Sequence, residues 1–445
     1  MRRRGILTAE WEKEPKIAVG VMDRQTEIFG HLEGVFHGDR LGPFSGPFSA
    51  KVDAGRIRLF NESLHQPIYV PSIRLISKKN SLFSLSNVTI GNQFHWERKE
   101  NQTFQGDLIL NLRPEGTICA INEISLEDYL TSVVSSEMSG EAPIEFLKAH
   151  AILSRSWLLA GLNRKKKKVG SPPQPEKTEE GEIIRWYDRE DHDLYDVCAD
   201  DHCQRYQGIS KSAVDNAQEA VRETHGRVLI FQDEICDARY SKCFGGLTEN
   251  FNTAWADKQI HYLTTVSDAP VSHQPIRTEE EASRWILSPP DAYCRVTDQH
   301  LLERILPGFD QETKNFFRWK VEYPRKELEE ILRQKSGFDF GTLIEILPLR
   351  RGPSGRITRL KIVGSKKSLV VGKELEIRRW LSRTHLYSSA FIVTADADRF
   401  ILYGAGWGHG VGLCQIGAAA MASKGFSAEE ILRRYFKGVK IEKIY

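Results

Sequence analysis

The sequence lacks long apolar runs and any excess of charge of one sign. No stretch of the 445 residues approaches the roughly 18 consecutive apolar residues of a membrane-spanning helix. The 62 Lys and Arg residues stand against 60 Asp and Glu residues, a formal net charge of +2. This balance gives no indication of a nucleic acid as a partner. The seven cysteines are odd in number, which argues against a complete disulfide framework.

The amino terminus also lacks part of an export signal. The basic residues of MRRRG resemble the start of such a signal, but charged residues interrupt the segment that should be apolar, at Glu10, Glu12, Lys13 and Glu14. Either the signal has been removed from this sequence, or the protein is not exported by the standard route.

Length and composition predict several globular parts. With 40% hydrophobic and 27% charged residues the chain can bury substantial cores, and 445 residues exceed one ordinary core. We expect residues 1–15 to lie outside the folded part, residues 16–100 to form a small β-rich module, and residues 101–445 to form a mixed domain of helices and strands. Inside it we predict a flexible Lys- and Pro-rich loop at about 163–185 and an α/β insertion at about 270–390. The predicted fold class is α+β.

Short alternating or β-branched runs carry the prediction of strands. Glycine and asparagine separate these runs, which cover residues 16–22, 26–36, 56–61, 67–77 and 84–91. A hairpin over residues 107–124 follows, with its turn at Pro114-Glu115-Gly116.

The pattern then changes to a helical period over residues 125–138, where Ser125 is placed to cap the helix. Glu137 lies four residues after Val133 and three after Val134, on the apolar face. Burial disfavours the ionised form of a carboxylate, and a general acid for glycoside cleavage must be protonated near neutral pH. The alternative is a helix-end glutamate that turns to solvent or pairs with Arg155.

Four ordered blocks over about residues 105–445 resemble the SpoIID/LytB family, named for stage II sporulation protein D. The first block, ISLEDYLTSVVSSEM with LKAHAILSRSWLLA, holds the family's Glu-Met pair at Glu137 and Met138 and its arginine at Arg155. The later blocks are DARYSKCFGGLTEN, RGPSGRITRLKIVG and GWGHGVGLCQIGAAAMASKG. Characterised members are lytic transglycosylases that cleave the MurNAc–GlcNAc β-1,4 bond of peptide-stripped strands, and their catalytic residue corresponds to Glu137.

The resemblance implies that residues 101–445 form a catalytic domain with a glycan-binding cleft. It also implies that the reaction needs one acid/base residue and no cofactor. Glu137 would protonate the leaving oxygen, and the C6 hydroxyl of MurNAc would attack C1 of the same sugar to leave a 1,6-anhydro end. The substrate implies the cell envelope, periplasmic or extracytoplasmic, as the location and peptidoglycan strands as the partner. The alternative is a non-catalytic, glycan-binding modifier of a cell-wall amidase, as some members of the family are described.

Five residues are candidates for contact with the substrate: Tyr240, Ser241, His409, Arg155 and Trp407. His409 lies between Gly408 and Gly410, where the backbone can approach a ligand closely. A histidine in such a turn is equally often structural. Arg155 is alternatively a buried partner that supports the fold, and Trp407 either stacks on a sugar ring or belongs to the core.

The segment HDLYDVCADDHC contains candidate metal ligands at His192, Cys198 and Cys203. Thiolate and imidazole ligands suit zinc, and some members of the family carry a structural zinc on a similar arrangement. The alternatives are a Cys198–Cys203 disulfide and free thiols. A metal-dependent hydrolase that uses this cluster is a further functional alternative, which predicts chelator sensitivity and reducing ends.

Overall fold

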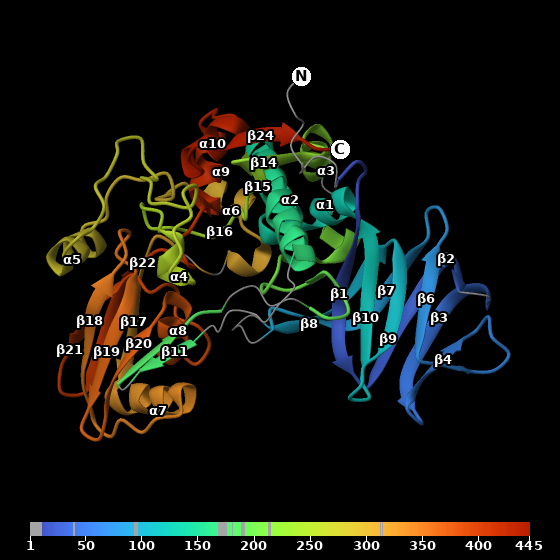
Figure 1. The fold of residues 1–445 in the computed structure, drawn as a ribbon, viewed down its shortest axis with the longest axis horizontal. Coiled ribbons are helices and arrows are strands. Elements are labelled where there is room, and N and C mark those ends of the chain that lie inside the picture. The colour runs from blue at the N-terminus through green and yellow to red at the C-terminus, as the bar shows by residue number, and fades with distance from the viewer. Residues whose placement is uncertain are drawn as a thin grey trace. The chain divides into compact units, whose positions relative to one another are not determined.

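The computed structural model describes residues 11–38, 41–92, 97–167, 176–179, 181–187, 192–211, 215–311, 313 and 315–445. The chain divides into two compact units. The first comprises Met1–Arg155, Asp191–Val228 and Lys443–Tyr445, and the second comprises Ser156–Glu190 and Leu229–Glu442. Helices and strands both contribute to each unit (Figure 1), which confirms the predicted α+β class.

Eleven of the described strands form one sheet that belongs to the first unit. Its main path runs β13-β1-β10-β9-β6-β2-β3-β4-β5, while β7 pairs with β2 and β8. The strands are β1 (Lys16–Gln25), β2 (Glu27–Gly38), β3 (Leu41–Asp53), β4 (Arg56–Asn61), β5 (Ile68–Val70), β6 (Ser72–Ser77), β7 (Leu82–Ile90), β8 (Arg98–Gln105), β9 (Asp107–Leu112), β10 (Ile118–Ser125) and β13 (Val197–Cys198).

The five predicted runs of strand and the predicted hairpin are confirmed. The hairpin is β9 paired antiparallel with β10, from Ile118↔Leu112 to Glu123↔Asp107. The strands β3 and β8 were not predicted, because prolines and glycines interrupt β3 and polar residues fill β8. The sheet also continues past the boundary expected at residue 100, since β8 crosses it and β9 and β10 pair with β6 and β1.

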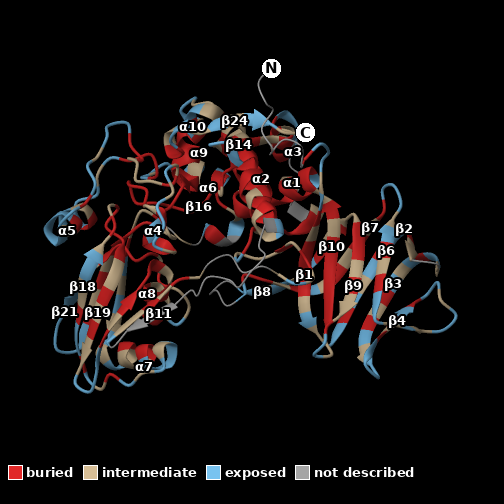
Figure 2. Ribbon diagram, viewed as in Figure 1, coloured by how far each residue is buried: buried red, intermediate tan, exposed pale blue. Residues whose placement is uncertain are grey.

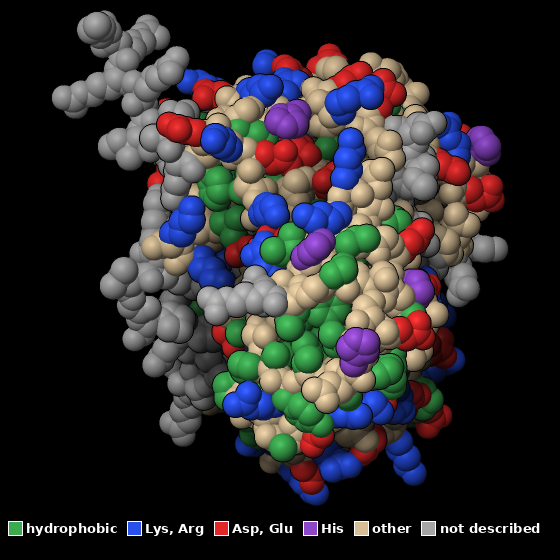
Figure 3. Space-filling model, turned by 90° about the vertical axis from the view of Figure 1, so that its right-hand side faces the viewer, with side chains coloured by type: hydrophobic (Ala, Val, Ile, Leu, Met, Phe, Trp, Pro, Cys, Tyr) green, Lys and Arg blue, Asp and Glu red, His purple; other side chains and the backbone are tan. Residues whose placement is uncertain are grey.

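Buried and more exposed residues alternate along strands of this sheet (Figure 2), because successive side chains of a strand point to opposite sides. On β4, Ile57 and Leu59 are buried, while the neighbouring Phe60 is 42% exposed. The register places Phe60 opposite Ser49 of β3, and Ser49 opposite Phe29 of β2. Hydrophobic side chains gather on an exposed face of this unit (Figure 3), and its strands carry the exposed residues Phe29, Val35, Phe60, Tyr69 and Ile76.

The helices of the first unit follow the sheet. They are α1 (Leu126–Glu137), the first part of α2 (Ile144–Lys167), a 3-10 turn (Gly208–Lys211) and α3 (Asp215–Glu223). The Ser125 side chain accepts a hydrogen bond from the Asp128 N–H at 3.2 Å, which confirms the predicted cap. In the described parts of the chain, no helix is both long and apolar enough to cross a membrane.

The second unit combines four small sheets with short helices. The sheet orders are β11-β12-β20-β19-β18, β17-β22-β21, β15-β14-β24 and β16-β23. The strands are β11 (Glu176–Glu179), β12 (Glu182–Arg185), β14 (Arg227–Phe231), β15 (Glu234–Ile235), β16 (Tyr240–Ser241), β17 (Arg318–Pro324), β18 (Leu343–Arg351), β19 (Ile357–Gly364), β20 (Ser368–Gly372), β21 (Phe391–Ala395), β22 (Arg399–Ala405), β23 (Leu413–Cys414) and β24 (Lys440–Lys443). The helices are α4 (Phe251–Ala254), α5 (Glu279–Leu287), α6 (Gln299–Ile305), α7 (Arg325–Ser336), α8 (Glu374–Trp380), α9 (Gln415–Ser423) and α10 (Ala428–Tyr435).

The expected insertion at about 270–390 shares its core with later elements. Its strand β17 pairs with β22, and Leu328 of α7, Trp380 of α8 and Leu402 of β22 pack in one hydrophobic cluster. Part of the loop expected at about 163–185 is regular structure, because α2 continues to Lys167 and β12 pairs with β20. Residues 168–175 and 180 of that loop lie outside the described residues.

Candidate functional site

Glu137 is the last residue of α1, and its side chain is buried. It is 8% exposed and lies on the helix face that also buries Leu130, Val133 and Val134. The predicted position of Glu137 on the apolar face of the helix is therefore confirmed. The alternative, a side chain turned to solvent, is wrong. The helix ends here because Met138 takes an extended conformation.

A segment distant in sequence packs against this end of α1. The Arg205 backbone N–H donates a hydrogen bond to Oε1 of Glu137 at 3.0 Å. The same segment contacts α1 twice more, through Gln207 N–H to Oγ of Ser132 at 3.2 Å and through the Tyr129 hydroxyl to Oε1 of Gln204 at 3.3 Å. One oxygen of Glu137 is thus oriented by a backbone donor, which had no signal in the sequence.

Arg155 does not pair with Glu137 but with Glu127, on the first turn of α1. Nε of Arg155 donates to Oε1 of Glu127 at 2.9 Å, and Nη1 donates to the Arg227 carbonyl at 2.9 Å. Arg155 is fully buried. Burial acts to raise the pKa of Glu127, but the charge and hydrogen bonds of Arg155 outweigh it and lower that pKa. These contacts favour the alternative in which Arg155 supports the fold.

The candidate metal ligands come together at the edge of the large sheet. The donor atoms of His192, Cys198, His202 and Cys203 all lie within 4.8 Å of one another, and both cysteines are free thiols. Cys198 is anchored by β13, which pairs with β1 through Gly20↔Cys198. The disulfide alternative is therefore wrong in this structure. His202 joins the predicted set, and its position between the two cysteines was the available signal.

The donor set fits a tetrahedral metal ion. The distance from His192 Nε2 to Cys203 Sγ is 3.3 Å, and His202 Nδ1 lies 3.5 Å from Cys203 Sγ and 3.8 Å from Cys198 Sγ. Two donors on one zinc ion, at about 2.0–2.3 Å from it, are separated by roughly 3.5 Å. A hydrogen bond with Cys203, together with burial, raises the pKa of the Cys198 thiol to about 11, while those with His192 and His202 act to lower it.

In the second unit, Tyr240 and Ser241 form β16, which pairs in parallel with β23. Ser241 lies against the Gly-rich loop, since the Gly410 N–H donates to its Oγ at 3.3 Å. The glycine at 408 is required by this packing, because φ is +94° and an added Cβ would lie 2.6 Å from Cβ of Ser241.

The His409 ring makes two hydrogen bonds with the backbone. Nδ1 accepts from the Val411 N–H at 3.0 Å, and a second hydrogen bond joins the ring to the Tyr240 backbone. Burial and the nearby charges of Arg239 and Arg356 hold its pKa well below the usual value, so the ring is neutral at pH 7. The ring also lies 4.9 Å from the ring of Trp255.

A buried network of hydrogen bonds supports the Gly-rich loop that contains Gly408 and His409. Arg356 is fully buried and donates to the Gly408 carbonyl through Nε and Nη2, each at 3.1 Å. Its Nη1 reaches Oγ of Ser354 at 3.0 Å, and Ser354 donates to Oε2 of Glu249 at 2.6 Å. Burial raises the pKa of Glu249. The sequence pattern did not single out Arg356.

Trp407 stacks on a neighbouring aromatic ring. Its ring centroid lies 4.2 Å from that of Tyr387 at an interplanar angle of 21°, and 4.9 Å from that of Phe316. These contacts favour the core alternative for Trp407. Contact of Tyr240, Ser241 and His409 with substrate stays a prediction, as does catalysis by Glu137.

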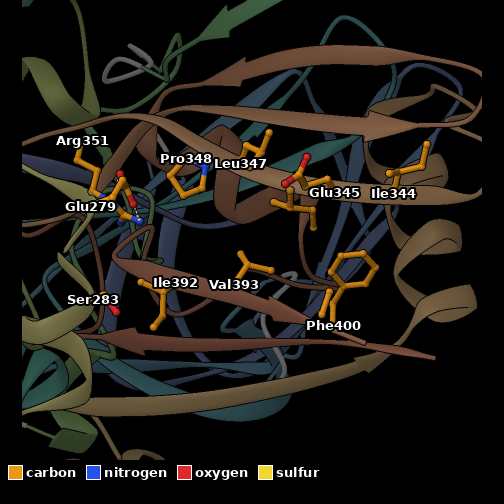
Figure 4. Close-up of a pocket in the computed structure, with 12 residues that line it drawn as sticks. Glu279, Ser283, Ile344, Glu345, Leu347, Pro348, Arg351, Ile392, Val393 and Phe400 are labelled. Carbon is orange, nitrogen blue, oxygen red and sulfur yellow. Dashed lines mark hydrogen bonds and ion pairs between the residues drawn. The ribbon is translucent and has the colours of Figure 1, made fainter. Parts of the chain in front are cut away.

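A groove of about 340 Å³ opens elsewhere in the second unit, between α5, β18 and the β21-β22 pair (Figure 4). An ion pair closes one end, where Arg351 Nε lies 2.7 Å from Oε1 of Glu279, and Phe400 lies toward the other. The walls between are largely aliphatic, including Leu347 and Val393. The residues predicted for the site are not among those that line this groove.

Residues 114–231 match the family described as Stage II sporulation protein. This segment is therefore similar to that family, as the sequence motifs predicted. The SpoIID match contains Glu137, Glu127, Arg155 and the His/Cys cluster. Residues 249–412 match a second family, described as a domain of unknown function (DUF8618), which contains Arg356 and His409.

The curated relatives of this chain are distant in sequence. Stage II sporulation protein D of Bacillus amyloliquefaciens is 24% identical over 325 residues, which cover 72% of this chain and 75% of that protein. The protein of the same name from Bacillus subtilis (strain 168) is 23% identical over 323 residues, covering 72% and 76%. The amidase enhancer of Bacillus subtilis is 24% identical over 262 residues, covering 54% of this chain but only 34% of the relative.

Proposed function

We propose that this protein is a lytic transglycosylase that cleaves the MurNAc–GlcNAc β-1,4 bond of peptidoglycan strands, with Glu137 as its acid and base. The SpoIID match and the relatives support the coarser statement, a role in the bacterial cell wall outside the cytoplasm. The observation that carries the finer proposal is the buried carboxylate of Glu137, in the position of the family's Glu-Met pair.

The chemistry needs one group that gives and then takes a proton. Protonated Glu137 donates its proton to the glycosidic oxygen, and the bond from that oxygen to C1 of MurNAc breaks through an oxocarbenium-like state. The C6 hydroxyl of the same sugar attacks C1, and the ionised Glu137 takes the hydroxyl proton. The atoms balance without water, and the product is a 1,6-anhydro end. Attack within one sugar avoids the entropic cost of bringing in a second reactant.

We assign a structural Zn²⁺ to His192, Cys198, His202 and Cys203. Bound there, the metal ties four residues of one segment together and contributes to folding. Cys203 lies two residues before Arg205, whose N–H contacts Glu137. The protein residues thus link the metal ligands to the orientation of the acid, and the metal takes no part in bond cleavage.

The deciding experiment compares Glu137→Gln with Glu141→Gln on amidase-stripped peptidoglycan, with products identified by mass spectrometry. Glu141 is an exposed carboxylate four residues away, so its variant controls for charge and handling. We expect 1,6-anhydro-MurNAc ends from the wild type and from Glu141→Gln, and none from a folded Glu137→Gln protein. Anhydro products from Glu137→Gln would refute the assignment, and reducing ends from the wild type would indicate a hydrolase instead.

The relative named amidase enhancer favours one second candidate, a non-catalytic modifier of a cell-wall amidase. That candidate predicts binding to glycan strands and a faster amidase, with no anhydro product from the wild type. The product analysis above separates the two functions, because the modifier acts without Glu137 chemistry.

A further inference from the structure

Three cysteines from separate parts of the chain meet inside the second unit. Cys243 follows β16, Cys294 lies between α5 and α6, and Cys414 ends β23. Their Sγ atoms all lie within 4.8 Å of one another. Exposure is 0% for Cys243 and Cys414 and 3% for Cys294, and all three are free thiols.

The spacing of the three sulfur atoms suits a shared metal ion. Thiolates bind zinc at about 2.3 Å, which separates two sulfur ligands on one ion by roughly 4 Å. Ordinary buried cysteines act as small hydrophobes and have no reason to converge. The fourth cysteine of this unit, Cys236, is equally buried but lies outside the cluster.

The backbone around the cluster is arranged for sulfur ligands. The Gly245 N–H donates a hydrogen bond to the Cys243 sulfur, in a turn where Gly245 has φ of +75°. An N–H donor stabilises a thiolate over a thiol. The Cys294 N–H donates to Oδ2 of Asp268 at 3.2 Å, and the Tyr435 hydroxyl donates to Oδ1 at 2.6 Å, so Cys294 is fixed by a buried carboxylate.

A partly buried cation beside the cluster supplies compensating charge. Nη1 of Arg318 donates to the Gly245 carbonyl at 3.1 Å, and Nη2 donates to the Trp285 carbonyl at 2.8 Å. Within the described ranges no carboxylate forms an ion pair with this guanidinium. Burial lowers the pKa of Arg318 to about 10, and negative charge on Cys294 and Cys243 acts against that lowering. Three thiolates with a monovalent or divalent metal ion carry net negative charge, which Arg318 offsets.

We infer that Cys243, Cys294 and Cys414 bind one soft metal ion, Zn²⁺ or Cu⁺, through three thiolates. Soft sulfur ligands select these two ions over hard cations such as Mg²⁺. The thiols lose their protons on binding. This site is independent of the proposed transglycosylase and of the His192 cluster.

The test removes the other cluster first. The full-length Cys198→Ser/Cys203→Ser protein is prepared without metal and titrated under reducing conditions with Zn²⁺ alone and, separately, with Cu⁺ alone. We expect one equivalent of one of these ions to bind. Adding Cys294→Ala should abolish this binding, while adding Cys236→Ala, the matched buried control, should leave it unchanged.

X-ray absorption at the metal edge keeps the test decisive if Cys294→Ala fails to fold. The Cys198→Ser/Cys203→Ser protein should then show three sulfur neighbours on the bound ion. Three results would each overturn the inference: no binding of either ion, a metal environment of nitrogen and oxygen only, or a protein mass lower by two hydrogens that reveals a disulfide in the cluster.

Discussion

The ion pair between Glu127 and Arg155 is expected to dominate the stability of the first unit. Arg155 is completely buried, and the Glu127 side chain is only 11% exposed. Glu127 accepts two further hydrogen bonds at Oε1, from the Gly226 N–H at 3.2 Å and from the Tyr445 hydroxyl at 2.6 Å. The carboxylate therefore joins α1, α2 and the carboxyl terminus of the chain.

Glu127→Gln keeps the shape of the side chain and removes its charge. The Arg155 guanidinium is then left buried without its counter-charge, which costs about 3–5 kcal/mol. Arg155→Met should also destabilise, because Glu127 loses its cation. In the double variant neither charge is left buried without its partner. The decrease in its free energy of unfolding should therefore be smaller, by about 1–3 kcal/mol, than the sum of the decreases in the two single variants.

The effect has a definite pH dependence. The pKa of Glu127 is lower in the folded protein than in the unfolded chain. Ionisation of Glu127 therefore stabilises the folded protein at pH values above the pKa that this residue has in the unfolded chain. That stabilisation is lost as the pH falls through the folded pKa. The difference between the wild type and Glu127→Gln should therefore be largest at neutral pH and shrink below about pH 4.3.

Hydrogen exchange of the α1 amides in increasing concentrations of urea measures the free energy of unfolding of the first unit, which contains α1. Lys51→Met is the control, because it breaks an exposed pair of the same unit, Lys51 with Glu27, and should cost less than about 1 kcal/mol. A Glu127→Gln protein no less stable than Lys51→Met, or a difference independent of pH, would refute the reasoning.

Two further predictions concern the Gly-rich loop and the zinc cluster. Gly408→Ala should lower the melting temperature of the second unit more than Gly425→Ala, because both have positive φ but only the first meets a neighbour, the Cβ of Ser241; equal shifts would contradict the packing argument. If the proposed zinc is bound at His192, Cys198, His202 and Cys203, its removal with a chelator should lower the melting temperature of the first unit, while cleavage persists where that unit stays folded. Immediate loss of cleavage with no change in stability would favour a metal-dependent hydrolase.

Local patterns predicted the elements that local physics controls. The strands of the first unit alternate in hydrophobicity, and the capping residue of α1 lies where its hydroxyl reaches the Asp128 N–H. Ser427 and Glu430 have the residue types and spacing of a capping box, and the structure contains that capping box. The strands β3 and β8 escaped prediction because their pairing, of β3 with β2 and β4 and of β8 with β7, overrides a weak intrinsic preference.

The site was predictable in type but not in its partners. Periodicity placed Glu137 on a buried face, and residue chemistry brought attention to His192, Cys198 and Cys203. Nothing in the pattern pointed to the Arg205 N–H as the donor to Glu137, since a backbone donor leaves no trace in residue type.

The sequence by itself determined the class of fold, the helix that carries Glu137 and the likeness to a cell-wall family, because these depend on period, capping and short motifs within single segments. Only the tertiary structure decided which charges pair. In the structure Arg155 pairs with Glu127 and not with Glu137, and His202 lies among the candidate metal ligands. Cys243, Cys294 and Cys414, from three segments of the chain, lie close together. Such choices depend on distances between residues far apart in the chain, which local periodicity does not encode.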